Sequence, residues 1–272
     1  MQSAFGVALL LLSGAAFAAP SAWESTLSSS ERGKFPNPRP LRATYQFGWS
    51  DLVAAQAEIS YGRSNGELTL VGTGQTAGIV RALWRFDVQH RAAADPATLR
   101  PLRMHQVDEL RKKTLTTDLV FNRDSVVRTR TDNRTKTPPK PKRFQSPSLF
   151  DLHSALLYIR SQSLEPGSVR RIVVYPATNG YLATITVAGR ESVTVGAGTY
   201  PAIKLDLQLR KIGKQRELLP HKKFRQASVW LSDDADRLLL RIEARVFVGT
   251  VFADLQSVEF TDEKRPDSPS KS

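Results

Sequence analysis

Residues 115–131 read Leu-Thr-Thr-Asp-Leu-Val-Phe-Asn-Arg-Asp-Ser-Val-Val-Arg-Thr-Arg-Thr. Two runs rich in β-branched residues flank Asn122-Arg123-Asp124, and apolar and polar residues approximately alternate within them. Asn and Asp favour tight turns because their side chains hydrogen-bond to the local backbone. This stretch therefore predicts a β-hairpin, which is the connection that builds antiparallel sheets.

The same pattern recurs along most of the chain. Runs of β-branched and aromatic residues are separated by turn sequences such as Ser64-Asn65-Gly66 and Thr178-Asn179-Gly180. The further predicted strands are residues 44–49, 54–61, 67–72, 82–91, 168–175, 181–187, 191–195, 200–210, 224–231, 238–246 and 250–260.

One segment, residues 148–162, is predicted to be an amphipathic helix. Leu149, Leu152, Leu156 and Ile159 recur at helical spacing, and Ser148 is the predicted N-cap. A single helix among more than ten strands does not form βαβ units, which disfavours a parallel sheet. We therefore predict a mainly β fold, with a large curved antiparallel sheet or open β-barrel and this helix packed on it. Two packed half-sheets would give the same pattern.

The termini differ in composition from this β-rich region. Residues 1–18 form a short apolar run that ends in Ala16-Phe17-Ala18, which predicts a cleaved signal peptide and a periplasmic protein; a retained anchor is the alternative. Residues 19–40 are rich in Ser, Pro and Arg and predict a flexible or extended leader. A single domain is expected over residues 41–262, and a disordered tail over residues 263–272.

The composition narrows the classes of function. The 272 residues include 39 Lys and Arg against 26 Asp and Glu, which gives a formal net charge of +13. Such a charge favours an anionic partner. The absence of cysteine excludes disulfides, thiolate nucleophiles and Cys-based zinc sites. An exported protein is separated from the genome, so we do not expect nucleic acid as the partner. We expect the partner to be an anionic envelope component (lipid, lipopolysaccharide or acidic glycan) or an envelope protein, with peripheral membrane contact.

Much of the positive charge lies in two clusters, within residues 134–143 and 210–225. Their Pro and Gly content predicts loops, which could bind an anion or could simply be solvated. The candidate anion-binding residues are Arg134, Lys136, Lys140, Lys142, Arg143, Arg210, Lys211, Lys214, Arg216, Lys222 and Lys223.

Other motifs favour structural roles. Asp233, Asp234 and Asp236 lack the glycine and distal Glu of a calcium loop and are predicted to cap a turn. The four histidines have no metal-ligand spacing, and no Gly-x-Ser-x-Gly elbow exposes a serine nucleophile beside His153. The Gly72 and Gly196 regions are predicted to be turns or bulges because no helix follows them to hold a phosphate. We therefore expect no cofactor, no metal and no catalytic residue.

Three segments carry a resemblance to a known family. They are Tyr45-x-Phe47-x-Trp49, the helical Asp151-Leu152-x-Ser154-Ala155-Leu156-x-Tyr158-x-Arg160, and Val229-Trp230-Leu231-Ser232-Asp233-Asp234 followed by Arg237-Leu238 and a strand pair that reaches Leu255. Over residues 41–260 the chain resembles the exported bacterial domain-of-unknown-function family 3108, although Leu239 stands where that family often has Pro. The resemblance implies a periplasmic, predominantly β domain without an assigned activity. Its curved sheet is similar in outline to periplasmic lipoprotein carriers, which does not settle function.

These observations lead to a functional hypothesis. We expect a non-enzymatic binding or carrier protein whose concave sheet face shelters an apolar or amphiphilic envelope ligand, such as a lipid or a lipoprotein acyl chain. The alternatives are a scaffold module that docks an anionic surface or a protein through its basic loops, and an enzyme with paired carboxylates. The candidate pocket residues, which could equally fill the core, are Phe47, Trp49, Trp84, Phe86, Leu156, Trp230 and Phe247.

Overall fold

The computed structural model describes residues 21–50, 52–220, 226–246 and 249–261. These residues form a 3-10 helix (Glu24–Thr26), two α-helices and sixteen strands. The α-helices are α1 (Gly78–Leu83) and α2 (Leu152–Ser161). The strands are β1 (Leu41–Trp49), β2 (Leu52–Ser64), β3 (Glu67–Thr76), β4 (Phe86–Ala94), β5 (Pro101–Leu110), β6 (Lys113–Asn122), β7 (Ser125–Asp132), β8 (Lys142–Gln145), β9 (Leu149–Phe150), β10 (Val169–Val174), β11 (Tyr181–Val195), β12 (Gly198–Ile212), β13 (Leu218–Pro220), β14 (Gln226–Ser232), β15 (Leu239–Arg245) and β16 (Thr250–Phe260).

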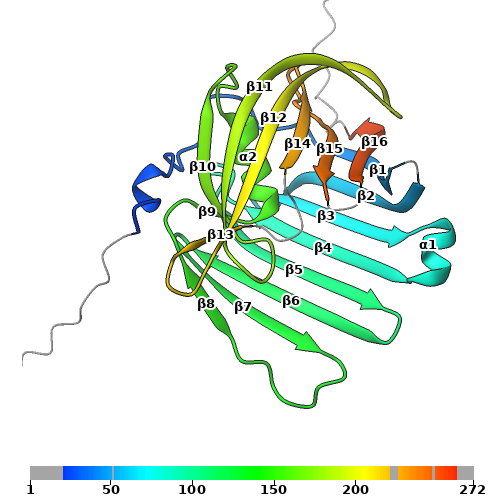
Figure 1. The fold of residues 1–272 in the computed structure, drawn as a ribbon, viewed down its shortest axis with the longest axis vertical. Coiled ribbons are helices and arrows are strands. Elements are labelled where there is room, and N and C mark those ends of the chain that lie inside the picture. Colours follow the sequence, from blue (N-terminus) through cyan, green and yellow to red (C-terminus); the bar gives the residue numbers. More distant parts are fainter. Residues whose placement is uncertain (1–20, 51, 221–225, 247–248, 262–272) are drawn as a thin grey trace, which may run out of the picture.

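All sixteen strands belong to one sheet. Its order is β8-β7-β6-β5-β4-β3-β2-β1-β16-β15-β14-β12-β11-β10-β9, with β13 paired to β12. Every pair is antiparallel except β9 with β10. The sheet curves around α2 into a nearly closed barrel (Figure 1), which confirms the predicted fold class. Because hydrogen bonds connect all the strands, the alternative of two packed half-sheets is wrong.

Helix α2 begins three residues later than predicted. Asp151, not Ser148, is the N-cap: its carboxylate accepts a hydrogen bond from the Ser154 N–H at 2.7 Å, and the Ser154 Oγ accepts one from the Asp151 N–H. Ser148 has a φ of 50°, and the two residues after it pair with β10 as β9. The buried apolar pair Leu149–Phe150 therefore belongs to the sheet rather than to the helix.

Three strand predictions also change. The segment predicted as a strand from residue 82 contains the end of α1, and β4 begins only at Phe86. Val71 to Gly74 lie inside β3 rather than in a turn, whereas Gly196 and Ala197 form the predicted turn between β11 and β12. Residues 181–195 form one long strand with a bulge near Gly189.

Residues 21–40 form a segment that the rest of the protein holds in place. This N-terminal segment lies along α2 and β10: the Tyr158 hydroxyl donates to the Ser29 carbonyl at 2.6 Å, and the Ser161 hydroxyl accepts from the Gly33 N–H at 2.9 Å. A Cβ on Gly33 would lie only 2.0 Å from the Ser161 carbonyl oxygen, so glycine permits this close approach. Hydrogen bonds between side chains of α2 and the backbone of the segment, which leave no periodic pattern in the sequence, hold it in place.

The core lies between α2 and the inner face of the sheet, which is the face toward α2. Side chains of α2 such as Tyr158 and Ala155 pack with Leu205 and Val229 from the sheet. A separate cluster joins the two edges of the sheet, where the rings of Phe144 and Tyr175 are 5.3 Å apart. None of the described helices has the length and apolar composition needed to cross a membrane. The predicted signal peptide (1–18) and tail (263–272) lie outside the described residues.

Candidate functional site

Four connections lie together at one end of the curved sheet. Because neighbouring strands are antiparallel, β1, β3, β5 and β7 end where β2, β4 and β6 begin. Figure 1 shows these connections in sequence, from the β1–β2 turn through α1 at the right to the β7–β8 loop at the bottom. We call this end the rim; its described residues are 47–50, 52, 77–85, 110–113 and 133–141.

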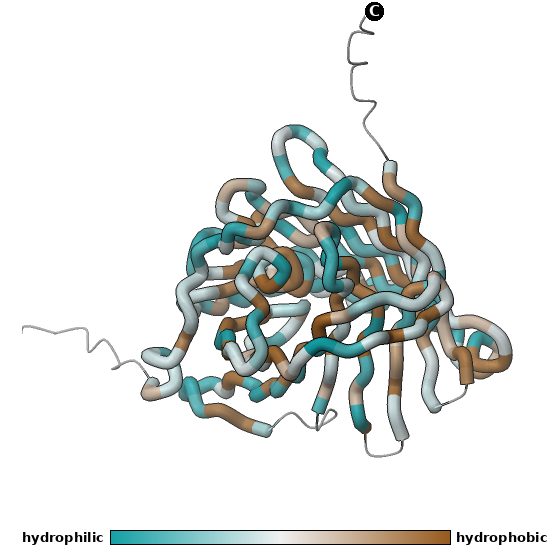
Figure 2. Tube along the Cα trace, turned by 90° about the horizontal axis from the view of Figure 1, so that it is seen from above, coloured by the Kyte–Doolittle hydropathy of each residue, from teal (hydrophilic) through white to brown (hydrophobic). Residues whose placement is uncertain are grey.

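The rim exposes large apolar side chains. In α1 and the residue after it, Ile79, Leu83 and Trp84 are 66%, 76% and 61% exposed. Helix α1 accounts for much of the hydrophobic colour at the right of the tube in Figure 2. Across the β1–β2 turn, Phe47, Trp49 and Leu52 are also exposed. Apolar groups gathered on a surface in this way mark an interaction site more often than isolated ones do.

Local hydrogen bonds hold α1 at the strand ends. The Thr76 hydroxyl donates to the Trp84 carbonyl and accepts from the Phe86 N–H, both at 3.1 Å, and so closes the loop. Arg81 forms two hydrogen bonds to the Asp87 carboxylate, at 2.6 and 3.3 Å. The Arg81 guanidinium lowers the pKa of Asp87, which favours the charged pair. The exposed apolar groups are therefore presented by a fixed structure.

Two of the exposed aromatic residues continue an apolar inner surface. Side chains that lie opposite each other on paired strands share a face of the sheet, and alternate residues of one strand do so too. Phe47 therefore shares a row with Ala253, Ile242, Val229 and Leu205. Trp49 shares the next row with Val251, Ala244, Ala227 and Leu207. The inner surface is thus apolar from the core at Val229 out to the rim.

Basic residues accompany the apolar groups. Residues 77–85 carry two Arg, residues 110–113 carry three Lys and Arg, residues 133–141 carry three, and none of these ranges contains an acid, so the formal charge is 2 + 3 + 3 = +8. Asp87 and Asp132 border the rim and pair with Arg81, Arg85 and Arg134. In the sequence, Glu109 also borders the rim and Asp51 falls between residues 50 and 52, so with all four acids included the formal charge is 8 − 4 = +4.

The structure brings four of the seven predicted pocket residues to one end of the sheet. Phe47, Trp49, Trp84 and Phe86 belong to the rim or border it, and the rings of Trp84 and Phe86 are 6.4 Å apart. Leu156 of α2 packs, half-buried, against the core cluster that contains Val229.

The other two predicted pocket residues do not join this group. Trp230 follows Val229 directly in β14 but belongs to a different core cluster, which contains Tyr45 and Leu240. It is buried there and donates a hydrogen bond to Glu191 at 2.6 Å. Phe247 lies outside the described residues.

The two predicted basic clusters approach β8 from its two ends. The loop that carries Arg134, Lys136 and Lys140 belongs to the rim and leads into β8, which contains Lys142 and Arg143. The second cluster approaches the other end of β8, where Arg216 donates to the Gln145 carbonyl at 2.8 Å. Of its remaining members, Arg210, Lys211 and Lys214 lie in or after β12, and Lys222 and Lys223 fall outside the described residues.

Several of these cations already have partners inside the protein. Arg216 forms an ion pair with Glu24 at 2.8 Å and lies over the rings of Trp23 and Phe144. Arg143 donates to the Ser125 hydroxyl and Arg210 to the Leu218 carbonyl. The second cluster therefore helps to hold the N-terminal segment and β13, which is a structural role that the sequence did not predict.

Sequence reasoning missed most of the rim. Leu52, Ile79 and Leu83 were not candidates, nor were the basic residues Arg81, Arg85 and Arg111 to Lys113. A usable signal was the run Ile79-Val80-Arg81-Ala82-Leu83-Trp84-Arg85, in which apolar and basic residues are mixed next to Gly78. It resembles the start of a strand, so its position at an exposed strand end was not apparent.

A buried polar cluster lies where α2 begins. Burial, together with smaller contributions from the neighbouring His90 and Arg160, lowers the pKa of His153 to about 3. Burial also lowers the pKa of His90 and raises that of Asp151. The rings of His153 and Tyr61 are 5.8 Å apart. Three atoms here, the Tyr61 hydroxyl, Asp151 Oδ2 and His153 Nε2, have no hydrogen-bond partner among the described residues.

This cluster does not assemble a nucleophile. The Ser154 hydroxyl donates to the Asp151 carboxylate at 2.6 Å, so the serine takes part in the helix cap. The described part of the chain holds no group of three or more His, Cys, Asp or Glu that could bind a metal ion. Asp234, as predicted, caps a turn: its Oδ1 accepts from the N–H groups of Asp236 and Arg237, both at 2.9 Å.

One solved structure has a similar fold. The chain is similar to a β-barrel-like protein of a domain of unknown function, DUF1849, from Brucella abortus, with a TM-score of 0.58 and 10% identity over 84% of this chain and 100% of that one. An exported protein with a YmcC-like fold from Bacteroides fragilis, so described, has a TM-score of only 0.31 at 8% identity over 84% of this chain and 99% of that one. The first similarity supports the barrel-like fold, and the second is too low to support an argument.

Comparison at the level of sequence gives the family. No protein with a curated description matches this chain. The model of the family described as protein of unknown function, DUF3108, matches residues 44–256, which include all strands from β2 to β15. The chain therefore belongs to the DUF3108 family.

Proposed function

We propose that the protein is a non-enzymatic binding protein of the bacterial cell envelope whose ligand is an anionic amphiphile, a lipid with acyl chains. One observation carries the proposal: the rim combines exposed aromatic and aliphatic side chains with eight basic residues and keeps a positive formal charge. In this reading the basic residues contact the head groups, and Trp84, Leu83 and Ile79 enter the apolar part of the lipid layer. The apolar signal-like run at residues 1–18 supports the envelope as the compartment.

The magnitudes favour a lipid surface over a merely solvated end of the sheet. Each basic residue near an anionic membrane contributes about 1 kcal/mol. The five rim cations outside the Asp87 and Asp132 ion pairs (Arg111, Lys112, Lys113, Lys136 and Lys140) would together contribute up to about 5 kcal/mol, which is more than a thousand-fold in affinity. Trp and Phe add to this because their rings suit the membrane–water interface.

The apolar rows on the inner face of the sheet suggest where one acyl chain of the lipid could bind. An acyl chain that leaves the lipid layer at Trp49 would meet the row formed with Val251 and Ala244. The adjacent Phe47 row runs toward Val229 and the half-buried Leu156 of α2. These contacts support uptake of a single acyl chain.

Vesicle binding tests the proposal. The protein is sedimented with vesicles of phosphatidylglycerol and phosphatidylethanolamine, and separately with vesicles of phosphatidylcholine alone. We expect binding to the anionic vesicles that weakens as salt rises from about 0.05 to 0.5 M, because salt screens the rim cations. The double variant Leu83→Ala/Trp84→Ala should bind at least ten-fold more weakly.

A matched control separates the rim from general hydrophobicity. Val120 is 60% exposed but lies on β6, away from the rim. Val120→Ala should bind anionic vesicles like the original protein. Absence of binding at low salt, or equal losses in the rim variant and the Val120 variant, would contradict the proposal.

A second candidate is a docking module that takes up no lipid. The observation that favours it is the packing of α2 against the inner face, where Tyr158 and Ala155 already cover Leu205 and Val229. Protein recovered from the anionic vesicles and analysed by mass spectrometry decides between the two. A carrier retains about one lipid per chain after separation, whereas a docking module retains none.

A further inference from the structure

An open pocket of about 880 Å³ crosses strands β16, β1, β2, β3 and β4 on the face opposite the core. The face follows from alternation in β1: Ala43 and Tyr45 are core residues, so Thr44 and Gln46 between them point away from α2. The pocket is distinct from the inner apolar rows because its polar side chains lie on the other side of the sheet.

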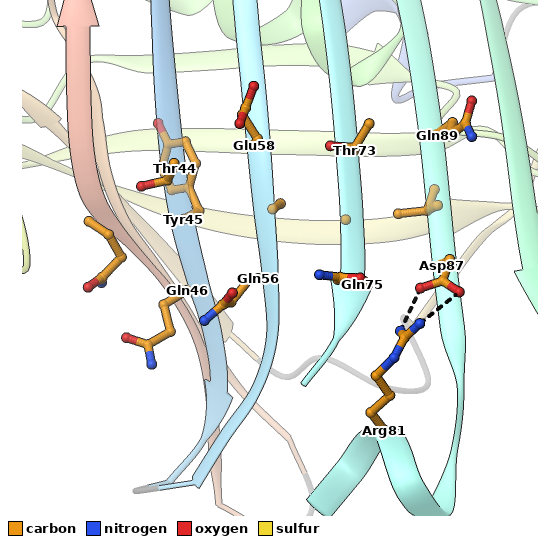
Figure 3. Close-up of a pocket in the computed structure, with 14 residues that line it drawn as sticks. Thr44, Tyr45, Gln46, Gln56, Glu58, Thr73, Gln75, Arg81, Asp87 and Gln89 are labelled. Atoms are coloured by element: carbon orange, nitrogen blue, oxygen red, sulfur yellow. Dashed lines mark hydrogen bonds and ion pairs between the residues drawn. The ribbon is translucent and has the colours of Figure 1, made fainter. Parts of the chain in front are cut away.

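Strand register arranges the polar lining of this pocket in two rows, which Figure 3 shows, and Tyr45, Ala57, Gly74 and Val88 lie between them. One row is Gln46, Gln56, Gln75 and Asp87, each opposite the next on neighbouring strands. The other row is Thr44, Glu58, Thr73 and Gln89. Neighbouring strands lie about 4.8 Å apart, so the amides of the first row repeat at close to the length of one sugar unit in an extended glycan.

The composition of the pocket departs from that of the chain. Five of the 12 glutamines of the whole sequence line it, whereas only one of the 39 Lys and Arg does so. That residue, Arg81, is paired with Asp87, and the Glu58 carboxylate lies 3.4 Å from Arg42. In a protein with a net charge of +13, this surface is close to neutral.

The amide groups are available to a ligand. The side chains of Gln46, Gln56, Gln75 and Gln89 make no hydrogen bond to any other described residue. Each amide offers two donor hydrogens and one acceptor oxygen. Hydroxyl groups of a sugar are donors and acceptors at once, so they complement a row of amides better than an ion or an acyl chain would.

We infer that this pocket is a binding site for a neutral glycan chain that lies across strands β1 to β4. Hydrogen bonds to the amide row hold the successive sugar units, and the volume falls within the range of ligand sites. The open form suits a chain that passes through rather than a small molecule that is enclosed. This inference is independent of the lipid proposal, since none of the lining residues except Arg81 belongs to the rim.

Nuclear magnetic resonance tests the inference directly through the glutamine side chains. The full chain, labelled with ¹⁵N, is titrated with chitohexaose, cellohexaose and maltohexaose in turn, without lipid. We expect at least one of these neutral oligosaccharides to shift the side-chain amide signals of Gln46, Gln56, Gln75 and Gln89. The signal of Gln208, which is exposed on β12 outside the pocket, should stay in place.

Paired variants complete the test. Gln56→Ala/Gln75→Ala should weaken binding of that oligosaccharide at least ten-fold, while the control Gln208→Ala/Gln226→Ala, which removes two exposed glutamines elsewhere, should leave it unchanged. The inference is overturned if none of the three oligosaccharides shifts the pocket signals, or if both double variants bind alike. The Leu83→Ala/Trp84→Ala variant should still bind the glycan, which separates this result from failure of the lipid proposal.

Discussion

At the end of the sheet covered by the N-terminal segment, Phe150 is 0% exposed and its ring lies 4.9 Å from that of Tyr158. At the rim, Trp84 is 61% exposed and its ring contacts one aromatic neighbour, Phe86. Both residues are large aromatics near the ends of strands, yet only Phe150 is covered by other parts of the protein. The packed aromatic is explained by folding alone, whereas the exposed one contributes little to folding and therefore points to an external partner.

The cover itself accounts for the difference. Residues 21–40 lie along α2 and β10, and Arg237 stacks on Phe35 at 3.5 Å from the ring centre. No comparable segment of the described chain lies over α1. One end of the sheet is thus completed by the chain's own N-terminal segment, whereas no described segment covers the other end.

Truncation of the packed aromatic should have the largest effect. Phe150→Ala removes a fully buried ring between α2 and β10, and such changes cost about 3–5 kcal/mol. Denaturant unfolding followed by circular dichroism measures the loss. A loss below about 1 kcal/mol would mean that the two ends of the sheet do not differ as their burial indicates.

Acid should destabilise the packed end, with an effect that depends on His153. Its pKa is lowered to about 3 in the fold, against about 6.5 in an unfolded chain. Below pH 6.5 the unfolded chain binds a proton that the folded chain does not, so stability is complete above that pH and falls as pH falls toward 3. At pH 4 the proton bound by the unfolded chain lowers the free energy of unfolding by about 3 kcal/mol, since each pKa unit is worth about 1.4 kcal/mol.

Two groups near His153 have opposite effects on the pH dependence of stability. The lowered pKa of His90 adds to the acid sensitivity, whereas the raised pKa of Asp151 gives stability that is lost as pH rises. His153→Phe and His153→Gln both remove the titration, so both should flatten the decline in unfolding free energy between pH 6.5 and 4. If both variants keep the original slope, burial of His153 does not govern the acid response.

Local patterns in the sequence predicted most of the strands and turns, but not β5 (Pro101–Leu110) or the short strands β8, β9 and β13. The hairpin around Asn122-Arg123-Asp124 and the turn capped by Asp234 are as predicted, because each depends on residues close together in the chain. Helix α1 was missed since six residues give less than two turns of periodicity and include Val80, which is common in strands. The covering role of residues 21–40 was missed because it rests on hydrogen bonds between α2 side chains and the segment's backbone, and on one close approach at Gly33.

The sites depend on strand order, which no local pattern contains. Phe47 and Trp49 were candidates, but their continuation into the Val229 row exists only because β1 pairs with β16, some two hundred residues away in sequence. The glutamine row is of the same kind: Gln46, Gln56 and Gln75 align only when β1, β2 and β3 take their observed register. A shift of one residue would turn each of these side chains to the other face.

Truncation of the exposed aromatic should have the smallest effect on stability. Trp84→Ala leaves intact the backbone hydrogen bonds that close α1, because Thr76 bonds to the carbonyl of Trp84 and to the N–H of Phe86 rather than to the ring. The ring is more than half exposed, so its removal should change the unfolding free energy by no more than about 0.5 kcal/mol, as is usual for surface positions. The same denaturant experiment as for Phe150→Ala measures this change, and near-ultraviolet circular dichroism checks that the core is unaltered. A loss above about 1.5 kcal/mol would show that Trp84 is needed for folding, and its exposure would then no longer argue for a partner at the rim.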